Sequence, residues 1–142
     1  MKSIVKGFVL SIALFFAVAF AGVNAQAQVR EIPAPINDIA IASFDMYGPV
    51  IYYNPIIVSQ AGPLLWEFFR AHEYGHINLR TGSEMAADCY ATQALLRTNP
   101  AAIEAFIQFK ASQGMAGGDA THLPGIERAR FVDACRRGMH NH

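Results

Sequence analysis

Residues 71–91, AHEYGHINLRTGSEMAADCYA, place two histidines, three carboxylates and a cysteine in one short stretch. His72, Glu73 and His76 form an H-E-x-x-H motif, and the residues around it recur at helical spacing. One face of the predicted helix carries Leu65, Phe69, His72, His76 and Leu79. Histidines four residues apart lie one turn apart on a helix, so both rings can reach one ion. The stretch therefore predicts a helix with a metal site.

Glu73 follows the first histidine around the predicted helix. It is placed to hold and deprotonate a water molecule rather than to bind the metal, and zinc would assist because it lowers the pKa of a bound water. Gly75 lets another backbone or a substrate approach the helix closely. These positions predict a catalytic site with Glu73 as the general base.

A catalytic zinc generally has a third protein ligand and an open position. The candidates downstream are Glu84, Asp88 and His122. A tight turn at residues 79–82 would fold a second helix back and bring Glu84 toward the histidines, with Asp88 hydrogen-bonding one ligand ring. Glu84 is the preferred third ligand, and Asp88 is the alternative.

The competing interpretation is that both histidines pack in an ordinary interface and that the acidic residues form a solvated face, since a bare H-E-x-x-H also arises by chance. The helix before the motif is, however, strongly apolar: Leu64, Leu65, Trp66, Phe68 and Phe69. A buried His-Glu-His group needs polar partners, and a metal supplies them. We therefore expect one zinc ion.

Two segments ahead of this helix predict strands. Residues 39–44 and 50–53 are β-branched and aromatic, and residues 45–49 between them predict a turn. Prolines on either side of the second segment favour an edge strand, with residues 56–58 as its extension. The Pro-containing polar segment 28–37 predicts an irregular start.

Four helices are expected after the strands, from Gly and Pro positions and capping residues. The first runs from Gly62-Pro63 to Thr81-Gly82, the second from the cap Ser83 to about Arg97, the third from the cap Asn99 and Pro100 to a break at 113–118, and the last from 126 to about Arg137 after a loop at 119–125. The expected fold class is α+β, a small zincin-like domain.

The first 27 residues have the order of a secretory signal peptide. Lys2 and Lys6 precede the apolar run 7–20, and Ala25-Gln26-Ala27 resembles a cleavage site, used after Ala25 or Ala27. The alternative is an uncleaved N-terminal anchor. Cleavage would leave residues 28–142 as one domain without a stable membrane span, periplasmic or secreted from a bacterium.

The charge and the cysteines agree with an exported, non-nucleic-acid-binding protein. Without Lys2 and Lys6, 9 basic residues stand against 11 acidic ones, a net charge of about −2, and no basic cluster suits nucleic acid. In an oxidising compartment Cys89 and Cys135 predict one disulfide, the alternative being two buried free thiols.

The segment HEYGH followed by EMAAD resembles the gluzincin metallopeptidases related to the CAAX prenyl protease and its bacterial membrane heat-shock relatives. Their pattern is H-E-x-x-H, then E-x-x-A-D on a following helix. The resemblance implies zinc bound by His72, His76 and Glu84, with Glu73 as the general base and Asp88 supporting a ligand.

Two further segments extend the resemblance. THLPGIER, residues 121–128, is similar to the family's T-H-P-P-x-x-x-R segment. By analogy His122 would stabilise the oxyanion and Arg128 would hold this segment in place, whereas the alternative has His122 only anchoring a helix start. VIYYNP, residues 50–55, resembles the family's edge strand, which could pair with an extended peptide.

The chain also departs from the family. His76 and Glu84 lie only about eight residues apart, Leu123 replaces the first proline of the downstream segment, and the relatives' membrane helices have no counterpart. We therefore expect a minimal, exported, soluble version of the domain. A Cys89–Cys135 bridge would tie the helix that carries Glu84 to the last helix.

The sequence supports two hypotheses about function. The first is a zinc metalloendopeptidase that hydrolyses a peptide or protein substrate. The second is a non-catalytic zinc-bearing periplasmic binding or regulatory module, which the small size favours, since little chain remains to wall a substrate cleft. An unidentified protein partner that completes the cleft fits either one. Glu73 separates them, because a structural zinc site does not require it.

Overall fold

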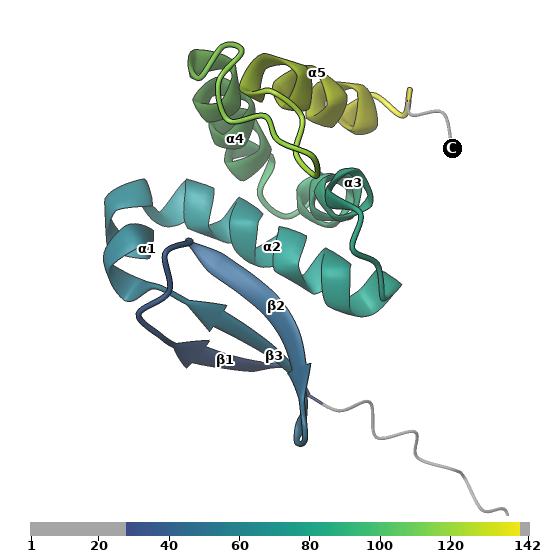
Figure 1. The fold of residues 1–142 in the computed structure, drawn as a ribbon. Helices are drawn as coiled ribbons and strands as arrows, with labels where there is room; N and C mark the ends of the chain where they lie inside the picture. The colour runs from purple at the N-terminus through teal and green to yellow at the C-terminus, as the bar shows by residue number, and fades with distance from the viewer. Residues whose placement is uncertain (1–27, 140–142) are drawn as a thin grey trace, which may run out of the picture.

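The computed structural model describes residues 28–139 (Figure 1). The predicted signal peptide, residues 1–27, lies outside the described residues. The described part has three strands and five helices: β1 Arg30–Pro33, β2 Ala40–Asp45, β3 Gly48–Tyr53, α1 Pro55–Ala61, α2 Pro63–Leu79, α3 Glu84–Leu95, α4 Pro100–Ser112 and α5 Gly125–Arg136. The predicted α+β class is confirmed.

The three strands form one sheet in the order β1-β3-β2. β2 and β3 form the predicted antiparallel hairpin, and β1 pairs in parallel with β3. The prediction of an irregular segment at residues 28–37 was wrong for residues 30–33, which form β1. Its four residues, REIP, carry no strand periodicity, and the strand is held by its pairing and by Glu31, which accepts hydrogen bonds from Arg70 and Tyr74 of α2.

The prediction of an edge position for β3 was also wrong, because β3 is the central strand. Pro49 is tolerated there for two reasons. It precedes Val50, where pairing with β1 begins. On the other side, the Ala42 N–H points away from β3, toward Glu73, so by alternation Phe44 and Pro49 are a pair without hydrogen bonds. β2 is instead an open edge, and it lies nearest the H-E-x-x-H helix.

Residues 56–58 do not extend a strand, contrary to expectation, but belong to α1. The Asn54 side chain accepts hydrogen bonds from the backbone N–H groups of Ile56 and Ile57, and Pro55 occupies the first turn. An N-cap followed by proline outweighs the β-branched composition of the segment.

The four predicted helices correspond to α2 to α5, with ends within about two residues of those expected. Ser83 caps α3 by accepting from Ala86 N, as predicted. Asn99 does not cap α4 with its side chain, contrary to the prediction, because its amide donates to Glu67 of α2 at 2.6 Å.

Helix α2 is the middle layer of the molecule (Figure 1). The sheet covers one of its sides, α3 and α4 cover the other, and α5 packs against α3 and α4. On the sheet side Ala40 and Ile51 pack against Ile77. On the helix side the Phe68 and Phe106 rings stack at 3.8 Å between centroids. Because α2 is covered on both sides, the polar groups of its H-E-x-x-H motif must find partners within the fold.

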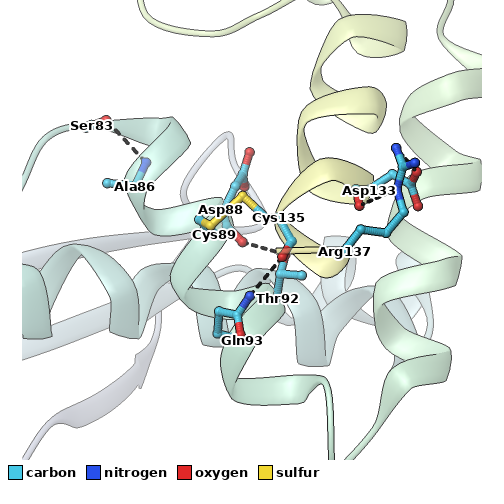
Figure 2. The surroundings of a disulfide bond; sticks show 9 residues. All are labelled: Ser83, Ala86, Asp88, Cys89, Thr92, Gln93, Asp133, Cys135 and Arg137. Atoms are coloured by element: carbon cyan, nitrogen blue, oxygen red, sulfur yellow. Dashed lines mark hydrogen bonds and ion pairs between the residues drawn. A yellow bond between two sulfur atoms is a disulfide. The ribbon is translucent and has the colours of Figure 1, made fainter. Parts of the chain in front are cut away.

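The predicted disulfide joins Cys89 of α3 to Cys135 of α5 (Figure 2). The two Cα atoms are 5.5 Å apart, and the Gln93 amide donates to the Cys135 carbonyl beside the bridge. A stable disulfide is the form expected in an oxidising compartment. Within residues 28–139 no helix combines the length and the hydropathy that a membrane crossing requires.

Candidate metal centre

Three side chains from two helices converge on one point, as the sequence predicted. His72 and His76 lie on α2, and Glu84 begins α3. His72 Nε2 lies 3.0 Å from His76 Nε2 and 3.1 Å from Glu84 Oε2, and His76 Nε2 lies 3.3 Å from Glu84 Oε1. Within the described part of the chain, these three residues form a group that could hold a metal ion.

The Nδ1 atom of each imidazole has a hydrogen-bond acceptor, which orients the ring. His72 Nδ1 lies 2.8 Å from Asp88 Oδ1, and His76 Nδ1 lies 2.9 Å from the Thr81 carbonyl oxygen. Each acceptor fixes a proton on Nδ1 and turns the Nε2 lone pair toward the shared point. Asp88 therefore orients the His72 ring and is not itself one of the three residues that could hold an ion.

The separations suit a tetrahedral metal. Ligand atoms about 2.0–2.1 Å from zinc and at tetrahedral angles lie about 3.3 Å from one another. The three measured separations are 3.0, 3.1 and 3.3 Å. When both rings are neutral, as metal ligands must be, two Nε2 lone pairs and a carboxylate face one another at these distances, and a cation between them would offset their repulsion. The donor set of two nitrogens and one oxygen is one that zinc accepts.

Asp88 and Arg128 form a buried ion pair beneath the ligands. Arg128 Nε and Nη2 donate to Asp88 Oδ2 and Oδ1 at 2.6 and 2.7 Å, and Arg128 Nη2 lies 3.7 Å from Glu84 Oε2. Arg128, which was expected to hold segment 121–128 in place, contacts the acidic residues of α3. Burial alone would raise the pKa of Asp88, but hydrogen bonds from His72 and Arg128 lower it.

The same contacts set the charge of the ligands. Burial lowers the pKa of His72, but hydrogen bonds to Asp88 and Glu84 outweigh burial and raise this pKa to about 9. For Glu84, burial acts to raise the pKa, and hydrogen bonds from His72 and His76 bring it well below its ordinary range. Glu84 is therefore ionised, as a metal ligand must be.

Helices α2 and α3 approach each other closely enough for a short turn to connect them. A Cβ on Gly75 would lie 2.9 Å from Ala87 Cα and 3.1 Å from Ala87 O. Arg80 ends α2 in the left-handed region, at φ 49°, and the Thr81 backbone N–H returns to the His76 carbonyl. The reversal places Glu84 one turn from Asp88 on the side that faces both histidines, as the short turn predicted.

Glu73 lies between the ligands and the sheet. Its Oε2 accepts from the Ala42 N–H of β2 at 2.6 Å, and no donor among residues 28–139 reaches its Oε1. Burial raises the pKa of Glu73, which the histidine charges only partly offset. A raised pKa suits a group that accepts a proton during a reaction.

His122 reaches the site from the loop before α5. Its Nε2 lies 3.2 Å from Glu84 Oε2, outside the set of three ligands. Asp119, which the sequence analysis overlooked, contacts His122 Nδ1 at 3.0 Å and accepts from the backbone N–H groups of Thr121 and His122. Asp119-Ala-Thr is an Asx-turn sequence, and this signal could have identified the residue that holds His122.

The ligands open onto one cavity of about 1260 Å³. Its walls come from β2, α1, α2, α4 and the loop before α5. Its lining includes Glu73, Glu84 and His122, and also Phe69, Phe109 and Lys110. Lys110 was not singled out in the sequence, where it appears as an isolated lysine near a helix end.

The chain matches no protein-family model, no curated protein and no solved structure with which it was compared. The assignment of a function therefore depends on the residues of the site.

Proposed function

We propose that this protein is a zinc metallopeptidase of the gluzincin type, in which His72, His76 and Glu84 hold one zinc ion. The observation that carries the proposal is the convergence of these three side chains, with Glu73 beside them at the wall of the same cavity. A structural zinc site needs four closed ligands, whereas three protein ligands and an open position are typical of catalytic zinc.

A zinc ion in this site would supply a Lewis acid that polarises the scissile carbonyl and lowers the pKa of water. Glu73 accepts the proton of the attacking water and returns it to the leaving amine. Its bond to Ala42 N holds the carboxylate against β2 and leaves Oε1 for the water. His122, oriented by Asp119, donates toward the oxygen that becomes negative.

The open edge of β2 is the surface on which an extended peptide would lie. Within residues 28–139, β2 pairs with β3 on one side only, and residues 39–42 line the cavity. The peptide-pairing role expected of β3 thus passes to β2. Main-chain pairing along an edge strand would lay a peptide or protein substrate across the site.

Export completes the proposal. The order of residues 1–27 predicts a signal peptide, and the disulfide suits the oxidising environment that an exported protein meets. We place the mature protein in the bacterial periplasm or outside the cell.

Substitution of Glu73 tests the proposal. Glu73→Gln keeps the size of the side chain and removes the base, so zinc content should stay at the wild-type level while peptide hydrolysis falls by about 10²–10⁴-fold. The matched control is Glu67→Gln on the same helix, outside the cavity, which should keep its activity. Zinc-loaded wild type that hydrolyses no peptide would instead support the non-catalytic binding or regulatory module, and full activity of Glu73→Gln would overturn the mechanism.

A further inference from the structure

We infer that Lys110 forms an anion subsite in the cavity of the metal centre and that the substrate carries a carboxylate which this lysine binds. This inference rests on the proposed function, and it adds the chemical class of the substrate. It is carried by the position of one half-buried ammonium group, by its aromatic surroundings and by the lack of a counter-ion among the residues that the structure describes.

Lys110 lies near the end of α4 and lines the cavity. Three aromatic rings surround its Nζ, at 5.4 Å from the Phe109 centroid, 5.8 Å from Phe106 and 6.0 Å from Phe69. Rings at these distances attract the cation through their π faces, and they exclude water from one side of it. The ammonium is thereby held at the cavity wall instead of extending freely into solvent.

No carboxylate among residues 28–139 lies within 4.0 Å of Lys110 Nζ. Its one hydrogen-bond partner in the described chain is the neutral amide of Gln113, at 3.3 Å. The neighbouring cation differs in this respect, because Arg128 is paired with Asp88 through two hydrogen bonds. Lys110 therefore keeps its capacity to bind an anion.

The four acidic residues that line the cavity do not supply this anion. Asp38 raises the pKa of Lys110 through its charge but forms no ion pair with it within 4.0 Å, and its Oδ1 accepts from Ile39 N. Glu84 faces the two histidines and His122, and Glu73 accepts from Ala42 N. Asp119 is engaged with His122 and Thr121. A partly desolvated cation without a counter-ion is unfavourable, and burial lowers the pKa of Lys110 accordingly. A ligand carboxylate would relieve this cost when it enters the cavity.

The ligand set and Lys110 line the same cavity, so one substrate can meet both. A cavity of about 1260 Å³ has room for a peptide segment rather than a single small group. An anchored carboxylate would fix which peptide bond reaches the metal centre, at a constant number of residues from the cut. The carboxylate comes from an Asp or Glu side chain or from the C-terminus of the peptide, and the two sources are distinguishable by experiment.

The test uses synthetic dodecapeptides of one neutral sequence in which each position in turn carries Asp or its neutral isostere Asn, each made with a C-terminal amide and with a free acid. Zinc-loaded mature protein should cleave the Asp peptide of one register about 10- to 100-fold faster than the Asn peptide, the worth of a charged hydrogen bond. A rate advantage confined to the free-acid series would assign the carboxylate to the C-terminus.

Lys110→Met removes the charge and keeps a flexible apolar chain over the rings, and it should abolish the preference. Lys110→Arg, which retains the charge, should preserve it and controls for folding. Arg80→Met is the matched control, since Arg80 also lines the cavity but is exposed at the end of α2. Cleavage by the wild type without a carboxylate preference, a preference that survives Lys110→Met, or one lost in Arg80→Met would overturn the inference.

Absence of all hydrolysis would count against the proposed function alone, and a binding measurement then decides on Lys110. Calorimetry of the same Asp and Asn peptides with zinc-loaded Glu73→Gln protein should show tighter binding of the Asp or free-acid form. This difference should vanish in the Glu73→Gln/Lys110→Met double variant. Equal binding of the charged and neutral peptides would overturn the anion subsite.

Discussion

At the scale of the residue, Asp88 connects the metal centre to the rest of the molecule. It accepts from His72 on one side and from Arg128 on the other, and it is almost fully buried at 1% exposure. A buried carboxylate with two charged or polar partners is stable only while both remain. Asp88 thereby orients the His72 ring and attaches α5 to α3.

Removal of Asp88 should therefore cost both stability and metal affinity. Asp88→Ala leaves Arg128 buried without its partner, so the free energy of unfolding should fall by about 3–5 kcal/mol. Zinc affinity should fall about 10- to 100-fold, because the His72 ring loses its acceptor. Urea unfolding and competition with a zinc chelator measure the two effects.

Asp133→Ala is the matched control for that substitution. Asp133 pairs with Arg136 and Arg137 in a more exposed setting on α5, and such pairs contribute less than about 1 kcal/mol. Equal losses of stability in the two variants would show that the Asp88–Arg128 pair does not have the role described above.

The titration of His72 predicts how the stability of the metal-free protein depends on pH. The folded pKa of His72 is about 9, above its ordinary value of 6.5. Its contribution is therefore fully present below pH 6.5 and is lost as the pH rises through 9, up to about 3 kcal/mol. Glu84 and Asp88 act in the opposite direction, because their pKa values are lowered in the folded protein. Their contribution to stability is present above about pH 4 and is lost in acid.

Thermal unfolding of the protein, kept metal-free with a chelator, between pH 4 and 10 would measure this dependence. Stability should be greatest near pH 5–6, and the added stability from zinc should grow with pH, because the metal competes with protons for the histidines. A metal-free protein that gains stability between pH 6.5 and 9 would contradict the arrangement of charges around His72.

At the scale of the element, the approach of α3 to α2 assembles the ligand set. The approach is closest at Gly75, where any side chain would meet the backbone of Ala87. The Tyr90 hydroxyl accepts from the Asn78 amide at 2.6 Å and adds a second contact between the two helices. The position of Glu84 relative to the histidines thus depends on one glycine and a short turn.

Gly75→Ala should separate the two helices. Its Cβ would lie 2.9 Å from Ala87 Cα and 3.2 Å from Tyr90 Cβ, so the free energy of unfolding should fall by about 1–3 kcal/mol even though alanine favours a helix. Zinc affinity should fall as well, since Glu84 moves with α3. Gly82→Ala, with no atom within 4 Å of its Cβ, should leave both quantities near wild type, and a similar result for Gly75→Ala would contradict the close approach.

The elements also show how far the sequence could predict this fold. Helical spacing and capping signals located α2 to α5, and the H-E-x-x-H and E-x-x-A-D spacings predicted which side chains meet, because these signals are local. β1 was missed because a four-residue strand is held by distant partners on α2 and β3. The wrong prediction that β3 is an edge strand has the same cause, because β1 pairs with its second edge.

Within the site, the residues that were missed share a cause. The environment of Lys110 consists of the rings of Phe69, Phe106 and Phe109 and of a cavity that exists only in the folded chain. Asp119 acts through a loop contact with His122. Neither residue has a helical or strand periodicity that would mark it in advance.

At the scale of the whole molecule, the fold holds a polar site within a small chain by covering α2 from both sides. The sheet supplies the strand edge beside Glu73, and the helical layer supplies Glu84, Asp88 and Arg128 (Figure 1). The Cys89–Cys135 bridge joins α3 to α5 one residue after Asp88 (Figure 2). The covalent link and the Asp88–Arg128 ion pair connect the same two helices, and together they fix the position of Glu84 at the start of α3.

Metal content tests the central claim, that His72, His76 and Glu84 form a zinc site. Mature protein, expressed without an affinity tag and dialysed against metal-free buffer, should retain one zinc per chain by elemental mass spectrometry. Glu84→Ala, measured beside it with Glu67→Ala as the control on the neighbouring helix, should lose most of its zinc. Wild-type protein without stoichiometric metal would contradict the claim, and tight zinc in Glu84→Ala would remove Glu84 from the ligand set.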